Sequence, residues 1–483
     1  MTKSRDTANI IKQPFTQTLG TSNYRAGVNA GNSITSGGNY NVTVGDEAGT
    51  AITTGDSNVA VGFAALKTED AHSGNTAIGY QSLEDLNAGA DSYNTALGYI
   101  SGTDITTGIR NTIIGAFSGD DLTDADYNVT LGFGALGSDT KGNKSIAIGV
   151  DALTAQNFTS STDTNNVAVG YQAGASVTTG RHNNFFGAVA GDAITDGESN
   201  VAIGTASLGS DTRGNFSVAI GHAALNSQNT TNDTDMYNTA VGYHAGTAVT
   251  TGIKNVILGS RAGDALTDAD SNIAIGESAL STDTLGSKSV AIGDSALYAQ
   301  NFTSATDTYN VAIGYAAGNA VTTGKFNTFL GGLAGDAINT ASSNVAVGYQ
   351  ALSADTKGDN SVAIGENALK LQNFTSSTDA YNTAVGVGAG STISTGERNV
   401  IIGARAGNLA TTPDDSVFIG YEAGAGATLT GHDNTYVGKR AGHVTTSGQR
   451  NTFIGRDAGS NVSTGSDNVC IGYDAISNSA SDG

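Results

Sequence analysis

Apolar residues return along nearly the whole chain in one short motif. The motif is an asparagine or serine, three mostly apolar or small residues and a glycine, followed three positions later by alanine or serine. One copy reads Asn-Val-Ala-Val-Gly at 166–170, and another reads Asn-Val-Ala-Ile-Gly at 310–314. About 26 copies occur, most of them 17 residues apart. A period this short and strict predicts a solenoid in which each copy forms one coil.

The length of one copy predicts the kind of coil. Seventeen residues are too few for a strand, a helix and two turns, but they suit two short strands and two turns. We therefore expect an all-β fold, a parallel β-roll or narrow β-helix of about 26 coils. At about 4.8 Å per coil, such a stack would extend for roughly 125 Å.

A longer period overlies the coil. Between 94 and 382 every fourth spacing is 21 residues instead of 17, which gives a superrepeat of 72 residues and four coils. The residue eight places after each start confirms this period, because it reads Gly, Gly, Leu, Leu and then repeats. The pattern lapses after residue 407. We therefore divide the chain into a repeat shaft at 23–407 and irregular terminal coils at 408–483, a candidate tip or cap.

Residues 1–22 lie outside the repeat. They are basic for this chain and contain Ile10, Ile11 and Phe15, which are available for docking. We interpret this segment as an attachment segment, with a frayed terminus as the alternative.

Alternation along the first strand assigns its side chains to two faces. The first and third residues after the leading asparagine share a face, and the third is nearly always large or branched. We expect this third row to fill the interior. Its representatives are Val169, Ile220, Leu258, Ile313 and Ile364.

The second position of the strand faces the other way and is also apolar. It is usually alanine and is periodically larger. A strand that is apolar on both faces is buried on both, and a bare apolar stripe would aggregate. We therefore expect an oligomer packed along its length, with the larger second-position residues at the intersubunit seam. These seam candidates are Ile113, Phe185, Ile257, Phe329 and Ile401.

Both corners of the strand carry a recurrent residue. The glycine that ends the strand fits a tight bend or a positive φ angle. The leading asparagine fits either a ladder of side-chain amides or a left-handed turn.

Charge and composition exclude several partners. The net charge is −22 and the basic residues are scattered, whereas nucleic acids and anionic membranes require clustered Lys and Arg. No run of 18 apolar residues predicts a membrane helix, so we expect no membrane insertion. The single cysteine, Cys470, lies at a strand position where other copies carry Ala, Ile or Phe, which predicts a small buried hydrophobe.

No motif predicts catalysis. The GxGxxG pattern at 132–137 lies in the ordinary repeat register, with no helix after it. The six histidines are dispersed, and no nucleophile–base or paired-carboxylate group stands out. We expect no enzyme activity, cofactor or dedicated metal site. Fortuitous cation binding at acidic corners such as 264–270 stays open, although the Gly-Gly-x-Gly-x-Asp repeat of calcium-binding rolls is absent.

The 21-residue coils carry inserted loops that should recur along one edge. Each of three such loops contains a phenylalanine that either stacks on a ligand such as a glycan or packs beneath its own loop or on a neighbouring subunit. We favour packing. These loop residues are Phe158, Phe302 and Phe374.

The strands resemble the Ser-Val-Ala-Ile-Gly repeats of trimeric autotransporter adhesin heads of the YadA type. The nearest matches lie at 145–149, 217–221, 289–293 and 361–365. Related repeats occur in bacteriophage tail fibres and other virion appendages. The resemblance covers about residues 23–480 and implies a left-handed parallel β-roll and a parallel homotrimer.

The resemblance also implies two functions. Autotransporter adhesins carry a signal peptide, a heptad stalk and a membrane anchor, none of which this sequence shows. A sequence that starts at Met1 without an export signal favours a structural fibre of a bacteriophage virion. Such a fibre would attach through residues 1–22 to a baseplate, tail or capsid protein and would contact a glycan or protein of the host surface. The alternative is a bacterial cell-surface or extracellular trimeric adhesin.

Overall fold

The computed structural model describes residues 20–476, and this part of the chain is all-β with no helix. Each coil contributes one three-residue strand. In four pairs of neighbouring coils, each coil also carries a two-residue strand. The chain divides into two compact units, one ending at Met236 and the other beginning at Tyr237. Each unit is a parallel β-solenoid.

The three-residue strands of the first unit are β1 (Tyr24–Ala26), β2 (Val42–Val44), β3 (Val59–Val61), β4 (Thr76–Ile78), β5 (Thr95–Leu97), β6 (Thr112–Ile114), β7 (Val129–Leu131), β9 (Ile146–Ile148), β11 (Val167–Val169), β12 (Asn184–Phe186), β13 (Val201–Ile203) and β15 (Val218–Ile220). Those of the second unit are β17 (Thr239–Val241), β18 (Val256–Leu258), β19 (Ile273–Ile275), β21 (Val290–Ile292), β23 (Val311–Ile313), β24 (Thr328–Leu330), β25 (Val345–Val347), β27 (Val362–Ile364), β29 (Thr383–Val385), β30 (Val400–Ile402), β31 (Val417–Ile419), β32 (Thr435–Val437), β33 (Thr452–Ile454) and β34 (Val469–Ile471). The two-residue strands are β8 (Gly142–Asn143), β10 (Thr162–Asp163), β14 (Gly214–Asn215), β16 (Thr234–Asp235), β20 (Gly286–Ser287), β22 (Thr306–Asp307), β26 (Gly358–Asp359) and β28 (Thr378–Asp379).

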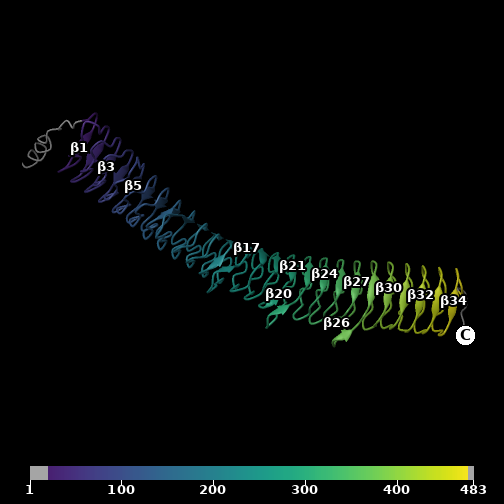
Figure 1. The fold of residues 1–483 in the computed structure, drawn as a ribbon. Coiled ribbons are helices and arrows are strands. Elements are labelled where there is room, and N and C mark those ends of the chain that lie inside the picture. The colour runs from purple at the N-terminus through teal and green to yellow at the C-terminus, as the bar shows by residue number, and fades with distance from the viewer. Residues whose placement is uncertain (1–19, 477–483) are drawn as a thin grey trace, which may run out of the picture. The chain divides into compact units, whose positions relative to one another are not determined.

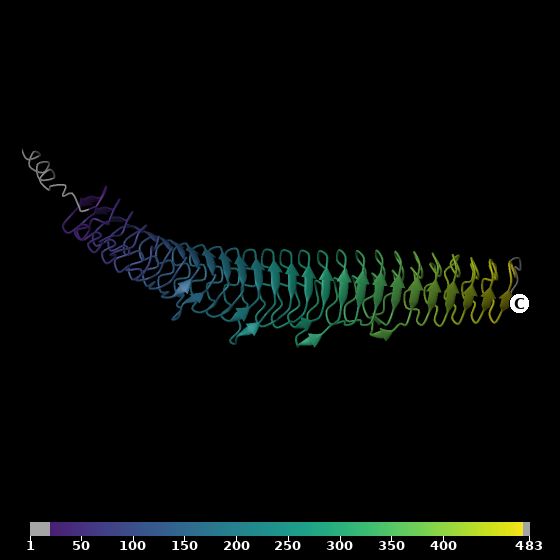
Figure 2. The same cartoon turned by 45° about the horizontal axis from the view of Figure 1, so that its top comes forward.

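The coils stack in strict register. In the second unit, β23 pairs in parallel with β21 on one side and β24 on the other, so that Ala312 lies between Ala291 and Phe329. The same pairing recurs through the row of arrows from β17 to β34 in Figures 1 and 2. The predicted parallel β-solenoid of about 26 coils is confirmed.

The leading asparagines form the predicted amide ladder. The backbone N–H of Asn327 donates to Asn310 Oδ1 (2.9 Å), while Asn327 Nδ2 donates across the coil to the carbonyl of Ala341 (2.9 Å). Asn310 and Asn327 are fully buried, so the ladder satisfies polar groups that would otherwise be stranded in the interior. The left-handed residue is instead the one before the asparagine, for example Phe326 with φ 60°.

The strand-ending glycine occupies a conformation that other residues avoid. Gly331 has φ +134°, and a Cβ atom added there would lie 2.8 Å from the carbonyl carbon of Gly348 in the next coil. Because these glycines stack directly on one another, both the backbone angle and the space require glycine.

The predicted register of the strands is wrong. The second position points into the interior, and the first and third positions point outward. The proposed seam residues Ile113, Phe185, Ile257, Phe329 and Ile401 are therefore fully buried within one chain. The proposed core residues face outward and are partly or largely exposed: Val169, Ile220, Leu258, Ile313 and Ile364.

The reason for the reversal is the asparagine ladder. The asparagine side chain reaches across the interior, and the period of two along a strand places the second following residue on the same inner face. The interior is narrow, so most coils fit only alanine there, as at Ala312. Side-chain size therefore indicated the wrong face, since the larger residues lie on the side with room.

Volume compensation inside the roll accounts for the Gly, Gly, Leu, Leu pattern of the superrepeat. The ring of Phe185 lies where a Cβ on Gly174 would come within 2.8 Å and one on Gly191 within 2.5 Å. In the next coil the strand position is Ala202, and Leu208 fills the space instead. Large and small residues thus alternate between the two walls of the interior, as close packing demands.

The last coils have a different interior. Phe418, Tyr436 and Phe453 occupy the second strand position in three successive coils, and their rings stack at centroid distances of 5.4 and 5.0 Å. Cys470 continues this row and is buried as predicted, and burial raises the pKa of its thiol. These coils keep the solenoid fold, and a role as tip or cap stays a prediction.

Candidate interaction surface

Each unit leaves an apolar sheet face uncovered. We define the outer face as the first- and third-position side chains of the three-residue strands. Every third-position residue is apolar, and no first- or third-position residue in these strands is charged. The first position is mostly valine or threonine, which are favoured on pleated surfaces.

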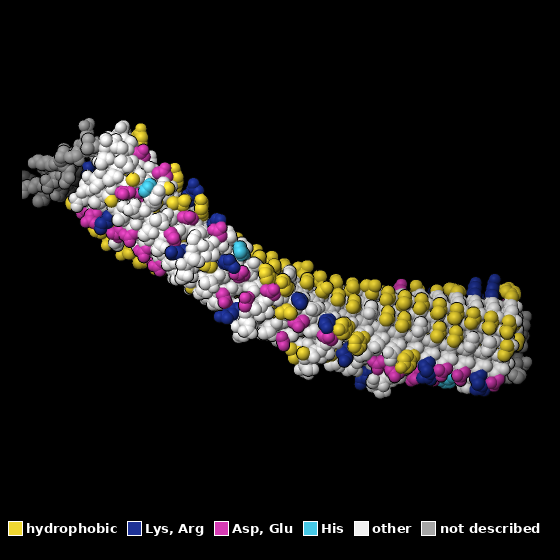
Figure 3. Space-filling view, viewed as in Figure 1, with side chains coloured by type: hydrophobic (Ala, Val, Ile, Leu, Met, Phe, Trp, Pro, Cys, Tyr) yellow, Lys and Arg dark blue, Asp and Glu magenta, His cyan; other side chains and the backbone are white. Residues whose placement is uncertain are grey.

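The outer face is exposed in a single chain. Leu131, Leu258 and Leu330 are 45, 45 and 46% accessible, whereas the second-position residue that precedes each of them is buried. In Figure 3 the outer face of the second unit shows as continuous rows of hydrophobic side chains, with charged groups set apart from them. Monomeric soluble proteins rarely expose apolar patches beyond a few hundred Å², and larger ones mark interaction sites.

Aromatic residues extend the apolar surface at the ends of the strands. In the first unit, the rings of Phe63, Tyr80, Tyr99, Phe117 and Phe133 form one column across five coils. Neighbouring ring centroids are 5.2–5.7 Å apart, and all five residues are exposed. Exposed tyrosine and phenylalanine are enriched at interfaces, because a large apolar body is combined with a small loss of conformational entropy.

A buried carboxylate anchors each inserted loop. In the second unit, Gln300 Nε2 donates to Asp283 Oδ2 (2.6 Å) and to Ser289 Oγ (2.8 Å). The backbone amides of Gly286 and Phe302 both donate to Asp283 Oδ1 (3.1 Å each). Equivalent buried pairs are Asp139 with Gln156, Asp211 with Gln228, and Asp355 with Gln372.

The loop phenylalanines are anchored rather than presented. Phe158, Phe302 and Phe374 are only 7, 6 and 5% exposed. This burial agrees with packing of the ring beneath its loop.

Half-buried aspartates recur once per superrepeat. Burial raises the pKa of Asp120 to about 6, with smaller contributions from the nearby charges of Asp121 and Asp104. Burial also raises the pKa of Asp192, Asp264 and Asp336, which lie 72 residues apart. The charged form of each carboxylate is therefore disfavoured in the folded chain.

One group among residues 20–476 places three metal-ligating side chains together. Single ligand atoms of Glu69, Asp70 and His72 lie within 4.8 Å of one another. Glu69 is fully buried, and its Oε1 accepts from both the ring Nδ1 and the backbone N–H of His72 (3.0 and 3.1 Å). Its Oε2 accepts from the backbone N–H of Ala88 (3.4 Å). The group thus resembles the Asp–Gln loop anchors, with His72 in the role of the glutamine.

Part of the predicted attachment segment cannot be placed. Its apolar residues Ile10, Ile11 and Phe15 lie outside the described residues. Within residues 20–476 there is no helix of the length and apolarity needed to cross a membrane. The chain matches no protein-family model, and no curated protein is significantly similar to it.

The sequence also carries a signal for the loop anchors, which was not among the predicted features. The buried acid–amide pairs recur with the 72-residue period at Asp139, Asp211, Asp283 and Asp355, which are always followed 17 residues later by glutamine. A polar pair repeated in register indicates a structural role. Its burial could not be read from composition, since aspartate is usually exposed.

Proposed function

We propose that the protein is a non-enzymatic structural fibre that assembles from copies of this chain along the outer face. The carrying observation is that face itself: apolar, uncharged and continuous along each unit. Burial of such a surface against a partner is the main favourable term in association.

The occupant of the outer face is a second and third copy of the same chain. The face carries one row of side chains per coil, so a partner matches it best when its rows have the same spacing. Another copy meets this requirement over the full length of a unit. The absence of charge on the face also fits the core of a homo-oligomeric interface, where charged residues are depleted.

The resemblance to trimeric head repeats supports a parallel homotrimer of left-handed rolls. By the same resemblance, we place the fibre on a bacteriophage virion, as a tail fibre or appendage that attaches through residues 1–22 and contacts the host surface. A bacterial trimeric adhesin is the alternative. The net charge of −22 keeps assembled fibres apart in solution.

A charge on the outer face tests the assembly. Leu330→Glu adds a carboxylate to a side chain that is 46% exposed in the single chain, so the coil should still fold. In an assembled fibre the same carboxylate would be buried without a partner, which is strongly unfavourable. Sedimentation velocity should show a smaller species for Leu330→Glu than for the wild type. The matched control is Thr303→Glu, on an exposed loop. Equal sedimentation of all three proteins would overturn the proposal.

The cellular setting needs a separate experiment. Mass spectrometry of purified phage particles from a strain that encodes this chain should detect its peptides at a stoichiometric level. Detection only in the washed cell-surface fraction would favour the adhesin and exclude the virion.

A further inference from the structure

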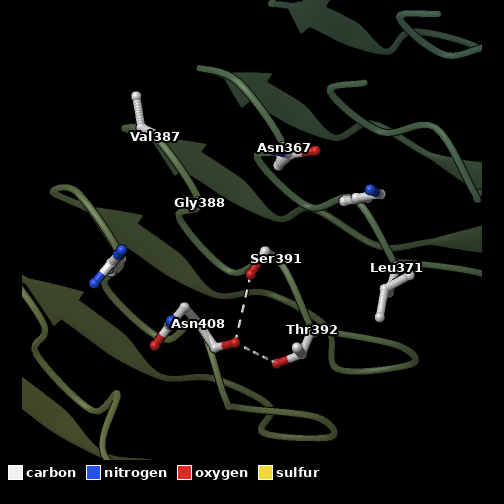
Figure 4. Close-up of a pocket in the computed structure, with 9 residues that line it drawn as sticks. Asn367, Leu371, Val387, Gly388, Ser391, Thr392 and Asn408 are labelled. Carbon is white, nitrogen blue, oxygen red and sulfur yellow. Dashed lines mark hydrogen bonds between the residues drawn. The ribbon is translucent and has the colours of Figure 1, made fainter. Parts of the chain in front are cut away.

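A cavity of about 460 Å³ opens on the turns of three successive coils in the second unit. Figure 4 shows Asn367, Leu371 and Val387 around its rim and Ser391, Thr392 and Asn408 at its lower side. The volume is in the range of pockets that hold small ligands.

Two cationic side chains line the cavity. Lys370 Nζ donates a hydrogen bond to a neutral group, Gln350 Oε1 (2.8 Å). Arg405 forms a long ion pair with Glu422, at 3.7 Å. No carboxylate lines the cavity. Two carboxylates lie beside the cavity without lining it: Glu422 pairs with Arg405 (3.7 Å), and Glu366 Oε1 accepts from Asn367 Nδ2 (3.3 Å).

The polar lining also offers hydroxyl groups as acceptors. Thr392 and Ser391 direct their hydroxyl hydrogens to the carbonyl of Asn408 (2.8 and 3.4 Å), so their oxygens remain able to accept. The site therefore suits a ligand that carries hydrogen-bond donors as well as an anionic group.

The other superrepeats show that this site is a local departure from the pattern. At the position of Asn408 they carry Asp192, Asp264 and Asp336, which would repel an anion. At the position of Gly388, which has no side chain, they carry Gln172, His244 and Ala316. A Cβ added to Gly388 would meet only Arg405 Cγ, at 3.9 Å. These two changes, at Asn408 and Gly388, coincide with a third. This superrepeat carries Lys370 where the other copies carry Thr154, Asn226 and Tyr298.

We propose that this cavity binds a carboxylate-bearing sugar residue of a glycan. Its carboxylate lies between Lys370 and Arg405, and its hydroxyl groups donate to the Ser391 and Thr392 oxygens. The apolar walls formed by Leu371 and Val387 contact the carbon face of the sugar. Charge-assisted hydrogen bonds of this kind are roughly twice as strong as those between neutral groups. The inference rests on the proposed fibre function, because it names a surface ligand for that fibre.

The probe is trigalacturonate, with neutral galactotriose as its uncharged counterpart and a sulfated dextran oligosaccharide as a second anion. Isothermal titration calorimetry with the full chain should show binding of trigalacturonate and at least tenfold weaker binding of the other two. Equal binding of galactotriose would overturn the carboxylate assignment. Equal binding of the sulfated sugar would reduce the site to a non-specific anion contact.

Two variants copy residues that the chain already tolerates at equivalent positions. Asn408→Asp restores the acid found at Asp336, and Gly388→Gln restores the side chain found at Gln172, which also has a positive φ (52°). Each should lower trigalacturonate affinity at least tenfold. Gly388→Gln should leave the melting temperature unchanged, whereas Asn408→Asp should lower it slightly at pH 7.5, because burial disfavours the charged form of an aspartate here as it does at Asp336. Lys357→Ala, a cation outside the cavity, should leave affinity unchanged. Unchanged affinity in Asn408→Asp, or an equal loss in Lys357→Ala, would exclude the site.

Native mass separates this inference from the fibre proposal. Loss of trigalacturonate binding in a protein that still assembles counts against the cavity alone. A monomer that binds trigalacturonate, and loses that binding in Asn408→Asp, counts against the fibre alone.

Discussion

At the scale of single residues, the coil depends on glycines that stack on each other. Gly331 and its neighbour Gly332 form a matched pair. Gly331 has φ +134° and would place a Cβ 2.8 Å from the next coil, whereas a Cβ on Gly332 would meet nothing nearer than 3.7 Å. Gly331→Ala should lower stability by about 1–3 kcal/mol from backbone strain alone. Gly332→Ala should be nearly neutral. Thermal melts followed by circular dichroism measure both, and equal melting temperatures would contradict the stacked-glycine account.

The half-buried aspartates make a second prediction at this scale. Because burial raises the folded-state pKa of Asp336 above its unfolded value, the charged form destabilises the fold at pH above that raised pKa. The penalty disappears as pH falls, until the unfolded chain is protonated as well near pH 4. Asp336→Asn, which copies Asn408, should therefore raise the melting temperature at pH 7.5, and the gain should shrink at pH 5.

Exposed Asp294 provides the control for this experiment, since Asp294→Asn removes the same charge from the surface of the same unit. If both variants melt alike at pH 7.5 and at pH 5, burial of Asp336 is not what limits stability.

At the scale of the coil, the register of the strand separates two roles. Phe185 fills the interior and Phe186 lies on the outer face, with 0 and 41% exposure. Phe185→Ala should cost about 3–5 kcal/mol, as cavities left by large aromatic residues do. Phe186→Ala should leave coil stability almost unchanged and weaken assembly only. Melting temperature and sedimentation of the two variants give the comparison, and a more severe loss of stability in Phe186→Ala would restore the original register.

The loop anchor is the second device at this scale. Asp283 accepts hydrogen bonds from Gln300 and from the amides of Gly286 and Phe302 in a fully buried position. Asp283→Ala leaves these neutral donors without an acceptor and should destabilise by about 1–3 kcal/mol for each donor that stays buried and unpaired. Hydrogen exchange should rise at 298–308 first. Protection of that loop at the wild-type level would show that the anchor is dispensable.

Sequence periodicity predicted the fold correctly, but it did not show which strand positions face the interior. The 17-residue spacing predicted the parallel coils, and the ladder that Asn310 and Asn327 form was one of the two roles expected for the recurrent asparagine. The faces were assigned by side-chain size, which fails in a roll too narrow for Val169 or Ile313. The cavity beside Asn408 could not be predicted from the sequence either, because it depends on which turns of successive coils become neighbours.

At the scale of the whole molecule, the outer face is the apolar surface that a single chain leaves exposed to water. Within each unit the interior is sealed, and ion pairs between neighbouring coils, such as Arg398 with Asp415 (2.7 Å) and Arg450 with Asp467 (2.7 Å), decorate the polar side. Exposed pairs of this kind contribute little to stability. Apolar burial between copies is therefore the term that we expect to hold a fibre together.

The most direct test of this account is the native mass of the purified chain by light scattering. The proposal predicts a stable species of three times 48.3 kDa that persists on dilution to micromolar concentration. A soluble monomer of 48.3 kDa would contradict it, because the outer face would then be stable in water without a partner.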